Sequence, residues 1–358
     1  MEVKYWTRAG LMLTDWCNAA CACCYANCGP GRRQWLSAEG AMKIWQSLIN
    51  ASPHGCRIHL TGGEPFGDFS LLLEICRLGR QRGLGPLESV ETNGYWAEND
   101  DQIYAHLHAL DEQGLGRLQI SADPYHQQFV PIERPRRLAE VARQVLGEAR
   151  VRVRWEDWLA GGSNVSASGC ECGTAAPGCA EFRENRTAEG DRATPLLELY
   201  AAAGRDRLTG RAADKLAGLL PTRPAEAFDG DGCAGPLLRG RHVHISPTGE
   251  VWPATCVGIT VGNALEEDVS EIWRRLSDSW RQMSVVGPLS QRGPMGLMDA
   301  AVQSGFVGRP GGYATKCQLC FDLRRHLLQR RVTPWWHELA PASLYEPDVA
   351  GGAAPPGA

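Results

Sequence analysis

The sequence predicts an α/β fold in which a mainly parallel sheet forms an open or partial barrel. Strand-like and helix-like segments alternate over the first 155 residues, and such βα repetition is typical of a parallel sheet. The expected strands are short apolar runs bounded by turn residues. Four of the loops that follow them carry cysteine, glycine or small polar residues, at the strand ends where barrels place their chemistry.

Each of the first four expected strands is followed by a helix. Ser37 and the glutamate two residues later predict the start of the first helix, because a serine side chain caps free backbone N–H groups. Gly83 predicts the end of the second. The expected strands are 9–14, 56–65, 86–94, 116–123 and 150–157. The expected helices are 37–50, 70–83, 98–112 and 135–149.

Residues beyond 157 follow no such repeat. The stretch 158–232 is rich in glycine, serine and alanine, so we expect loops with two short helices, in "PLLELYAAAG" and "RAADKLAGLLP". The segment "RHVHISPTGEVWPATC" predicts a hairpin that turns at "PTGE". Apolar spacing predicts an amphipathic helix over 269–283. Many glycines predict a loop over 287–314, and the tail over 346–358 is expected to be disordered.

Composition and charge narrow the class of protein. Hydrophobic residues make up 43% of the 358 and charged residues 22%, which is ordinary for a globular enzyme. A formal net charge of -4 gives no overall field that favours nucleic acid or an anionic membrane. The sequence has no apolar run of about 18 residues and no secretory signal at its start. We therefore expect a cytoplasmic protein with neither nucleic acid nor membrane as a partner.

Fourteen cysteines are the strongest chemical signal. In a reducing cytosol, clustered cysteines indicate a metal site or catalysis rather than disulfides. Cys56 and Cys76 stand alone and are expected to be buried structural thiols. The others form one group within residues 17–28, a second within residues 170–179, and four positions in the last third of the chain.

Cys17, Cys21 and Cys24 have the spacing C-x3-C-x2-C, directly after the first expected strand. Three thiolates on one tight loop can hold three irons of a four-iron, four-sulfur cluster, because soft thiolates select such clusters. The fourth iron then stays open to another ligand. The alternative is a closed zinc site that uses Cys23 or Cys28 as its fourth ligand.

The segment "LTDWCNAACACCY" resembles the signature of the radical S-adenosylmethionine (radical SAM) superfamily. The family usually has an aromatic or apolar residue where this chain has Cys23. The resemblance extends over residues 9–157 and implies a partial (β/α)6, TIM-like barrel. It also implies that Cys17, Cys21 and Cys24 hold a 4Fe–4S cluster whose open iron binds S-adenosyl-L-methionine.

Further motifs occur in the order that the family has them. The segment "TGGEP" is similar to its glycine–glutamate motif, so Gly62, Gly63 and Glu64 would hold the methionine ammonium group. Small polar residues at the third and fourth strand ends would hold the ribose hydroxyls and the methionine carboxylate; these are Thr92, Asn93, Ser121 and Asp123. For Asp123 the alternative is that it caps the turn before Pro124.

The chemistry of this family is reductive cleavage of S-adenosylmethionine. One electron yields a 5′-deoxyadenosyl radical, which abstracts a hydrogen atom from the substrate. The resemblance therefore implies an enzyme that takes electrons from an external one-electron reductant of the flavodoxin or ferredoxin type. It assigns no catalytic residue that acts on the substrate.

Cysteines in the last third indicate a second metal centre. Cys233 precedes the expected hairpin, Cys256 follows it, and "CQLC" adds Cys317 and Cys320 at C-x2-C spacing. Four thiolates can close around one iron–sulfur centre, and a zinc site with the same ligands is the alternative. The arrangement is similar to the twitch or SPASM extensions of radical SAM enzymes, which implies one auxiliary iron–sulfur cluster.

The resemblance divides the chain into three parts and a tail. Residues 1–160 would form the radical SAM partial-barrel core, and residues 161–232 a loop-rich insert or linker that completes it. Residues 233–335 would form a small hairpin-plus-helix extension that holds the auxiliary cluster, and residues 346–358 the disordered tail.

Other polar residues are assigned by their type and position. Cys170, Cys172 and Cys179 are candidates for further metal ligation or for a reactive thiol, and loop thiols without a role are the alternative. His59 lies on an expected strand, and we expect it to be an ordinary core residue with a hydrogen-bonded ring.

Within this class we expect a ribosomally made peptide as the substrate. The alternative is a dehydrogenase or epimerase that acts on a small molecule. From another class, the chain would be a non-catalytic zinc or iron–sulfur module that acts by interaction. The acidic balance and the lack of a basic stripe count against an RNA-modifying enzyme.

Overall fold

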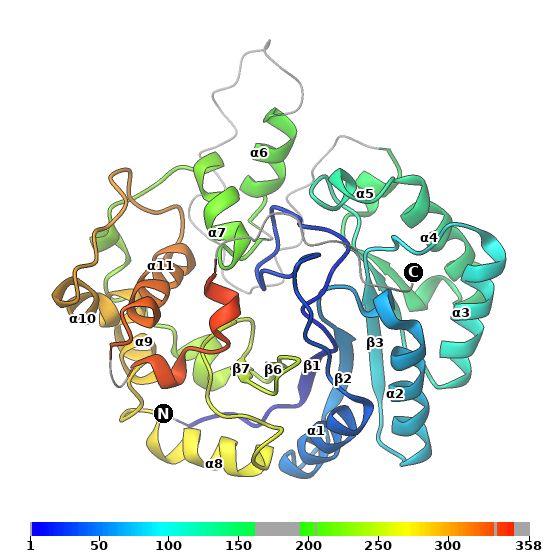
Figure 1. The fold of residues 1–358 in the computed structure, drawn as a ribbon, viewed down its shortest axis with the longest axis horizontal. Coiled ribbons are helices and arrows are strands. Elements are labelled where there is room, and N and C mark those ends of the chain that lie inside the picture. The colour runs from blue at the N-terminus through cyan, green and yellow to red at the C-terminus, as the bar shows by residue number, and fades with distance from the viewer. Residues whose placement is uncertain (1, 162–193, 205, 333–334, 347–358) are drawn as a thin grey trace.

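The structure is a computed structural model that describes residues 2–161, 194–204, 206–332 and 335–346. Cys170, Cys172 and Cys179 and nearly all of the predicted tail lie outside these residues. The described strands form one sheet in the order β5-β4-β3-β2-β1-β6-β7 (Figure 1). The strands are β1 (Arg8–Met12), β2 (Arg57–Thr61), β3 (Leu87–Thr92), β4 (Leu118–Ile120), β5 (Val151–Val153), β6 (His242–Ile245) and β7 (Val251–Pro253).

The sheet is mostly parallel and open. Strands β1 to β6 pair in parallel, and only β7 runs antiparallel, beside β6. Strands β5 and β7 are its two edges, so the described sheet does not close into a full barrel. The prediction of an α/β fold with an open, mainly parallel sheet is confirmed.

Helices follow the first four strands and cover the outer side of the sheet (Figure 1). The Oγ of Ser37 caps the first helix, as predicted, by accepting from the N–H of Gly40 at 3.1 Å. The predicted helices are confirmed to within a few residues at their ends. These helices are α1 (Ala38–Ala51), α2 (Phe69–Gln81), α3 (Asp100–Glu112), α4 (Glu133–Leu146) and α8 (Val269–Ser279).

The glycine-rich stretch 287–314 was predicted as a loop, and this prediction was wrong. It contains α9 (Val286–Arg292), a 3-10 helix (Gly293–Leu297) and α10 (Met298–Gln303). Buried residues at spacings of three and four, among them Val286 and Leu289, hold these short helices against the core. The remaining helices are α5 (Glu156–Leu159), α6 (Thr194–Ala202), α7 (Arg211–Lys215) and α11 (Lys316–Gln329).

The predicted hairpin is present, and its first strand also belongs to the main sheet. Strands β6 and β7 pair antiparallel, and Gly249 takes the left-handed conformation (φ 94°) that the turn requires. Strand β6 pairs in parallel with β1 on its other side. The division of the chain at residue 233 stays a prediction, but the hairpin shares a sheet with the residues before that boundary.

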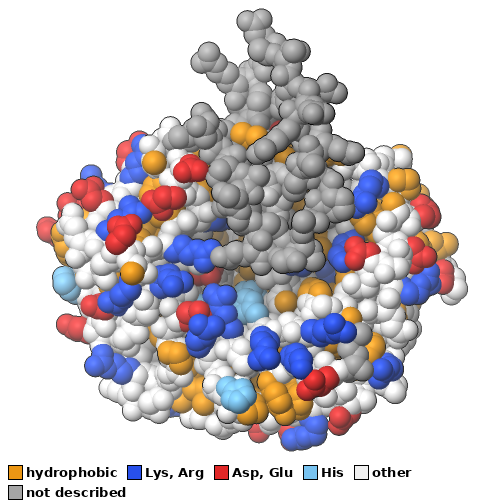
Figure 2. Space-filling view, turned by 180° about the vertical axis from the view of Figure 1, so that it is seen from behind, with side chains coloured by type: hydrophobic (Ala, Val, Ile, Leu, Met, Phe, Trp, Pro, Cys, Tyr) orange, Lys and Arg blue, Asp and Glu red, His pale blue; other side chains and the backbone are white. Residues whose placement is uncertain are grey.

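Charge is unevenly spread over the surface. The face seen in Figure 2 has Lys and Arg side chains gathered across its middle, with Asp and Glu side chains mostly nearer its edges. This face therefore has a basic centre although the chain is net acidic. None of the described helices has both the length and the apolar character that a membrane span requires.

Candidate functional site

The loop that follows β1 brings its cysteines to one cavity of about 520 Å³. Cys17, Cys21 and Cys24, called the loop triad below, all line this cavity, and so do Cys23 and Cys28. Cys24 is half-buried and the other four are buried. Residues at the carboxyl ends of β2, β3 and β4 line the same cavity, which is where a parallel sheet places its functional loops.

Hydrogen bonds hold this loop in a fixed conformation. The N–H of Cys17 donates to the carbonyl of Gly29 (3.2 Å), and the N–H of Cys24 donates to the carbonyl of Cys21 (3.0 Å). Arg211 of α7 is buried beside the loop and donates to the carbonyls of Cys21 (3.3 Å) and Cys28 (2.8 Å). A residue distant in the sequence therefore fixes the backbone that carries the triad.

The thiols of the loop affect one another's ionisation. Burial raises the pKa of Cys21, and neighbouring thiols, Cys23 foremost, raise it further. The pKa of Cys24 is instead lowered to about 6, chiefly by hydrogen bonds from Cys28 and also by the charge of Arg211. The backbone N–H of Cys28 lies 3.2 Å from the Sγ of Cys24. Neighbouring thiolates raise one another's pKa, and a bound cation would favour their ionised form. The donor set therefore fits an iron–sulfur cluster.

Gly62 and Gly63 allow the end of β2 to approach the cysteine loop. A Cβ atom on Gly62, whose φ is +145°, would lie 2.6 Å from the carbonyl oxygen of Thr14. A Cβ atom on Gly63 would lie 1.9 Å from the carbonyl oxygen of Trp16. The N–H of Gly63 also donates to Thr14 at 2.7 Å. Both glycines line the cavity, so backbone rather than side chain faces it here.

Glu64 is fully buried and links two strand ends. Its carboxyl group accepts from the Thr92 hydroxyl (2.8 Å), the Asn93 N–H (2.7 Å) and the Phe66 N–H (3.2 Å). Burial raises its pKa to about 7. Glu64 is not among the residues that line the cavity, and a contact of its carboxyl group with a methionine ammonium group stays a prediction.

Three of the predicted polar residues line the cavity with the loop triad: Thr92, Asn93 and Ser121. The Nδ2 of Asn93 donates to the Oδ1 of Asn18 (2.8 Å) and lies 3.6 Å from the Sγ of Cys17. The N–H of Ser121 donates to the carbonyl of Thr92 at 2.8 Å, so the ends of β3 and β4 are joined. The structure thus brings residues from three strand ends to the cysteine loop.

Asp123 is fully buried and is not among the residues that line the cavity. Its Oδ1 accepts from the N–H groups of Tyr125 and His126, both at 3.0 Å, so it caps the turn as the alternative interpretation held. Its carboxylate also contacts the His126 ring (2.8 Å) and Arg154 (3.0 Å). Burial by itself would raise the pKa of Asp123, but His126 and Arg154 hold it well below its usual range.

A second set of thiols gathers where the hairpin meets α11: Cys233, Cys256, Cys317 and Cys320, called the hairpin tetrad below. Burial raises the pKa of Cys233, and the other three thiols raise it further, so all four interact electrostatically. Arg207 lies beside them, with its Nη1 3.8 Å from the Sγ of Cys317.

The sulfur atoms of the two cysteine sets can be compared with the ligands of a single zinc ion. Among the described residues, neither the loop triad nor the hairpin tetrad supplies three ligand atoms that all lie within 4.8 Å of one another. Around one tetrahedral zinc ion, with Zn–S bonds of about 2.3 Å, sulfur atoms lie about 3.8 Å apart. Among the described residues, therefore, neither set has three sulfur atoms as close together as the ligands of one zinc ion.

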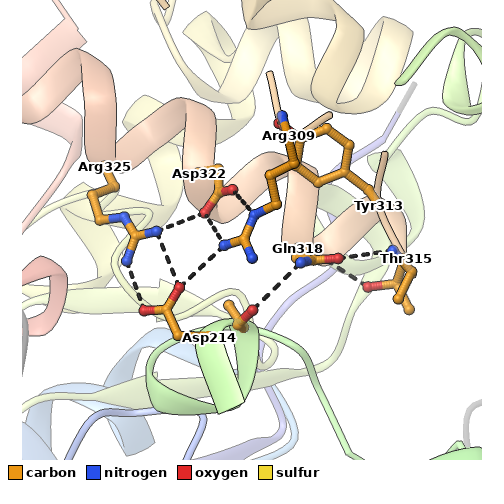
Figure 3. Close-up of polar contacts among 9 residues, drawn as sticks. Asp214, Arg309, Tyr313, Thr315, Gln318, Asp322 and Arg325 are labelled. Atoms are coloured by element: carbon orange, nitrogen blue, oxygen red, sulfur yellow. Dashed lines mark hydrogen bonds and ion pairs between the residues drawn. The ribbon is translucent and has the colours of Figure 1, made fainter. Parts of the chain in front are cut away.

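An ion-pair network fixes the first turns of α11, the helix that carries two of the tetrad thiols (Figure 3). Asp322 accepts from Arg309 (2.6 Å) and from Arg325 (2.8 Å). Both guanidinium groups also bond to Asp214 of α7, at 3.1 Å and 2.8 Å. The hydroxyl of Thr315 caps the helix by accepting the N–H three residues later at 3.2 Å. The network therefore fixes α11 against α7.

Three histidines also line the cavity: His59 on β2, and His242 and His244 on β6. We expected His59 to be an ordinary core residue with a hydrogen-bonded ring. It is buried, but its Nδ1 has no hydrogen-bond partner among the described residues. The alternation of a strand turns its side chain into the cavity rather than toward the helices. Burial lowers the pKa of all three rings, that of His244 to about 4.

Sequence reasoning missed several residues that shape the cavity. Arg152 and Arg154 alternate with valines in the last predicted strand, and this alternation places both on one face. The segment "HVH" gives the same signal for His242 and His244. Arg211 gives no such signal, because it lies in the stretch without a repeat.

Comparisons with known proteins give distant likenesses. No family model matches the chain. A sequence relative is the "Putative peptide biosynthesis protein YydG" of Bacillus subtilis (strain 168), which is 24% identical over 143 residues. The match covers 39% of this chain and 43% of that protein, so the chain spans less than half of the curated relative it matches.

Solved structures also resemble the chain. BtrN in complex with AdoMet and 2-DOIA is 14% identical, with a TM-score of 0.43, over 79% of this chain and 91% of that one. Streptococcus suis SuiB bound to S-adenosylmethionine is 13% identical, with a TM-score of 0.42, over 75% and 65%. The anSMEcpe structure with bound AdoMet and Cp18Cys peptide is 13% identical, with a TM-score of 0.43, over 93% and 100%.

These TM-scores describe a loose likeness, and a shared fold does not by itself imply a shared function. The three solved structures were determined with S-adenosylmethionine bound.

Proposed function

We propose that the chain is a radical SAM enzyme that reductively cleaves S-adenosylmethionine and abstracts a hydrogen atom from its substrate. One observation carries this proposal: the loop triad lines the same cavity as the glycine turn after β2 and the polar ends of β3 and β4. Three cysteines leave one iron of a 4Fe–4S cluster without a protein ligand. Gly62, Gly63, Thr92, Asn93 and Ser121 would hold S-adenosylmethionine there.

The chain's own residues would position these groups. When bound, the cluster and S-adenosylmethionine supply a one-electron cleavage that yields a hydrogen-abstracting radical. Gly62 and Gly63 present backbone groups to the cavity, and Glu64 keeps them in register with Asn93 through its hydrogen bonds across the strand ends. Cys17 and Cys21 are buried, which would keep bulk water away from a cluster held there.

We also propose that the hairpin tetrad holds one auxiliary iron–sulfur cluster. Its four thiols come from three separate segments and interact electrostatically. No three of these four sulfur atoms lie within 4.8 Å of one another, whereas those around one zinc ion lie about 3.8 Å apart. Arg207 and the buried Arg324 interact with tetrad thiols, so their positive charges would offset the negative charge of a thiolate cluster.

A peptide is the substrate that we propose, and a flavodoxin- or ferredoxin-type protein would supply the electron. The name of the Bacillus relative concerns peptide biosynthesis, which favours a peptide. Glu91, Gln119 and Arg152 line the cavity, so the group received there is polar or charged. A small molecule that undergoes oxidation or epimerisation is the alternative that this polar lining also suits.

Anaerobic reconstitution with iron and sulfide tests the proposal. We expect about eight irons per chain, four for each cluster, and 5′-deoxyadenosine when dithionite and S-adenosylmethionine are added. Cys24→Ala should abolish this product, because a triad ligand is lost. Cys76→Ala, which removes a buried thiol of α2 outside the cavity, should leave the product unchanged.

The outcome that contradicts the enzyme is equally specific. About two zinc ions per chain, one for each cysteine set, with no 5′-deoxyadenosine under reductant, would support the non-catalytic metal-binding module instead. Peptide and small-molecule substrates are then separated by which class of compound increases 5′-deoxyadenosine formation and itself loses hydrogen.

A further inference from the structure

The three histidines of the cavity form a compact group that the proposed chemistry does not use. One ring nitrogen from each histidine can be chosen so that the three nitrogens all lie within 4.8 Å of one another. The ring centroid of His59 lies 5.1 Å from that of His242 and 5.5 Å from that of His244. The centroids of His242 and His244 are 4.4 Å apart. His59 is 2% exposed and His244 4%.

A glycine in the middle strand allows this convergence. Strand β1 lies between β2 and β6, and Gly10 is in register with His59 on one side and with His244 on the other. A Cβ atom at residue 10 would lie 2.6 Å from His59 Nε2 and 2.5 Å from His244 Cδ2. Strands two places apart are separated by about 10 Å. The two rings therefore lean across β1 toward each other because Gly10 has no side chain.

The ring nitrogens are only partly hydrogen-bonded. The Nδ1 of His244 donates to the carbonyl of Ala254 at 2.7 Å, so its Nε2 keeps a free lone pair. This bond is of the kind that orients a metal-binding histidine. The Nδ1 of His59 and the Nε2 of His242 are buried and have no hydrogen-bond partner among the described residues. Buried nitrogens without partners destabilise a fold, and a bound cation would satisfy lone pairs here.

We propose that His59, His242 and His244 bind one divalent transition-metal ion of the kind that prefers imidazole, with Zn²⁺ as the test case. Imidazole suits zinc, iron, copper and nickel, whereas magnesium and calcium take oxygen ligands. Three histidines with one further position form the ligand set of a catalytic zinc site. Because all three line the cavity, an oxygen or nitrogen atom of the substrate can take that position.

The charges around this histidine group permit a cation. The Oε1 of Glu91 lies 3.9 Å from the Nε2 of His59, close enough to balance positive charge. Arg8 acts electrostatically on all three rings, and Arg207 acts on His244. The guanidinium group of Arg8 is paired with Glu88 at 2.5 Å, and that of Arg207 lies 3.8 Å from the Sγ of Cys317. The site uses no residue of the loop triad, so it does not depend on the proposed cleavage of S-adenosylmethionine.

The test loads the iron–sulfur-reconstituted full chain with Zn²⁺ alone and removes loosely held ion by dialysis. Metal analysis should give one zinc per chain beyond the iron. X-ray absorption at the zinc edge should show nitrogen or oxygen neighbours at about 2.0–2.1 Å. His59→Gln, His242→Gln and His244→Gln should each weaken zinc retention at least tenfold, whereas His54→Gln, at an exposed loop position, should not.

A second variant and a second readout keep the test decisive. Gly10→Ala retains all three imidazoles but places a Cβ atom against two of them, so it should also weaken zinc binding, with iron content as the check on folding. No retained zinc in the unsubstituted chain, or only sulfur neighbours at about 2.3 Å, would overturn the site. Cys24→Ala should keep this zinc although it loses cleavage, which separates failure of the site from failure of the proposed enzyme.

Discussion

Gly63 shows how closely two parts of the candidate site are packed. A Cβ atom there would lie 1.9 Å from the carbonyl oxygen of Trp16, the residue before the first triad cysteine. Gly63→Ala should therefore displace the loop, lower the free energy of unfolding by about 1–3 kcal/mol and reduce iron incorporation. Urea denaturation and iron analysis measure both effects.

The matched control is Gly218→Ala, where an added Cβ atom meets nothing within 4 Å. This variant should keep both the stability and the iron content of the unsubstituted chain. Equal iron in the two variants would show that the close approach of Gly63 to the loop does not matter for the cluster.

Among the elements, α11 connects the hairpin tetrad to the rest of the fold. Thr315 caps this helix two residues before Cys317. Thr315→Ala should cost about 1 kcal/mol of stability and loosen the turn that holds two tetrad thiols. We expect the auxiliary iron to be lost more readily on dialysis, while 5′-deoxyadenosine formation persists.

Ser37→Ala is the control for this prediction, because Ser37 caps α1 in the same way, accepting an N–H at 3.1 Å. It should cost similar stability and leave the iron content unchanged. If both cap variants lost iron to the same extent, the loss would follow from general destabilisation and not from α11.

The contact between α7 and α11 predicts a pH dependence. Burial by itself would raise the pKa of Asp214, but Arg325 and Arg309 lower it below its ordinary value. A carboxyl group with a lower pKa in the folded chain stabilises the fold above about pH 4 and loses that contribution as the pH falls. Asp214→Asn should therefore lower the free energy of unfolding by about 1 kcal/mol at pH 7, since the network is partly exposed, and by clearly less at pH 3.

Urea denaturation of the cluster-free chain at both pH values measures this difference. Glu226→Gln, at an exposed carboxylate of the neighbouring 3-10 helix (Ala225–Phe228), is the control and should have no effect at either pH. A loss of stability from Asp214→Asn that is the same at both pH values would mean that its charge does not stabilise the fold.

For the whole molecule, two cysteine sets within one fold predict two separable centres. Cys320→Ala should lower the iron content by about four per chain and leave some cleavage of S-adenosylmethionine that is no longer coupled to substrate. Cys56→Ala, which removes a lone buried thiol, should change neither. If Cys320→Ala and Cys24→Ala removed the spectrum of the first cluster equally, the division of ligands would be wrong.

The order of strands and helices could be predicted because each element carries a local signal. Ser37 and the apolar spacing after it are enough to predict α1, and the alternation of arginine and valine over 150–157 is enough to predict β5. The pairing of β6 with β1 could not be predicted, because residues far apart in the sequence leave no local sign of contact. The helices within 287–314 were missed because glycine content suggested a loop, whereas burial of Val286 and Leu289 decides the structure.

The parts of the candidate site that lie in short motifs could also be predicted, whereas the parts that depend on long-range contacts could not. Spacing along one loop identified Cys17, Cys21 and Cys24, and a short motif identified the glycines that face the same cavity. The histidine group could not be predicted, since it requires β1 between β2 and β6 and a glycine at residue 10. The hydrogen bonds from Arg211 to the carbonyls of the cysteine loop could not be predicted either, because Arg211 is distant from the loop in the sequence.

The central claim is that the loop triad leaves one iron open to S-adenosylmethionine. The most direct measurement is electron paramagnetic resonance of the reduced Cys317→Ala/Cys320→Ala variant, in which the first cluster is the one that remains, with and without S-adenosylmethionine. The cofactor should change the g values of the cluster signal, because it binds to an iron of that cluster. An identical signal with and without S-adenosylmethionine would contradict the claim.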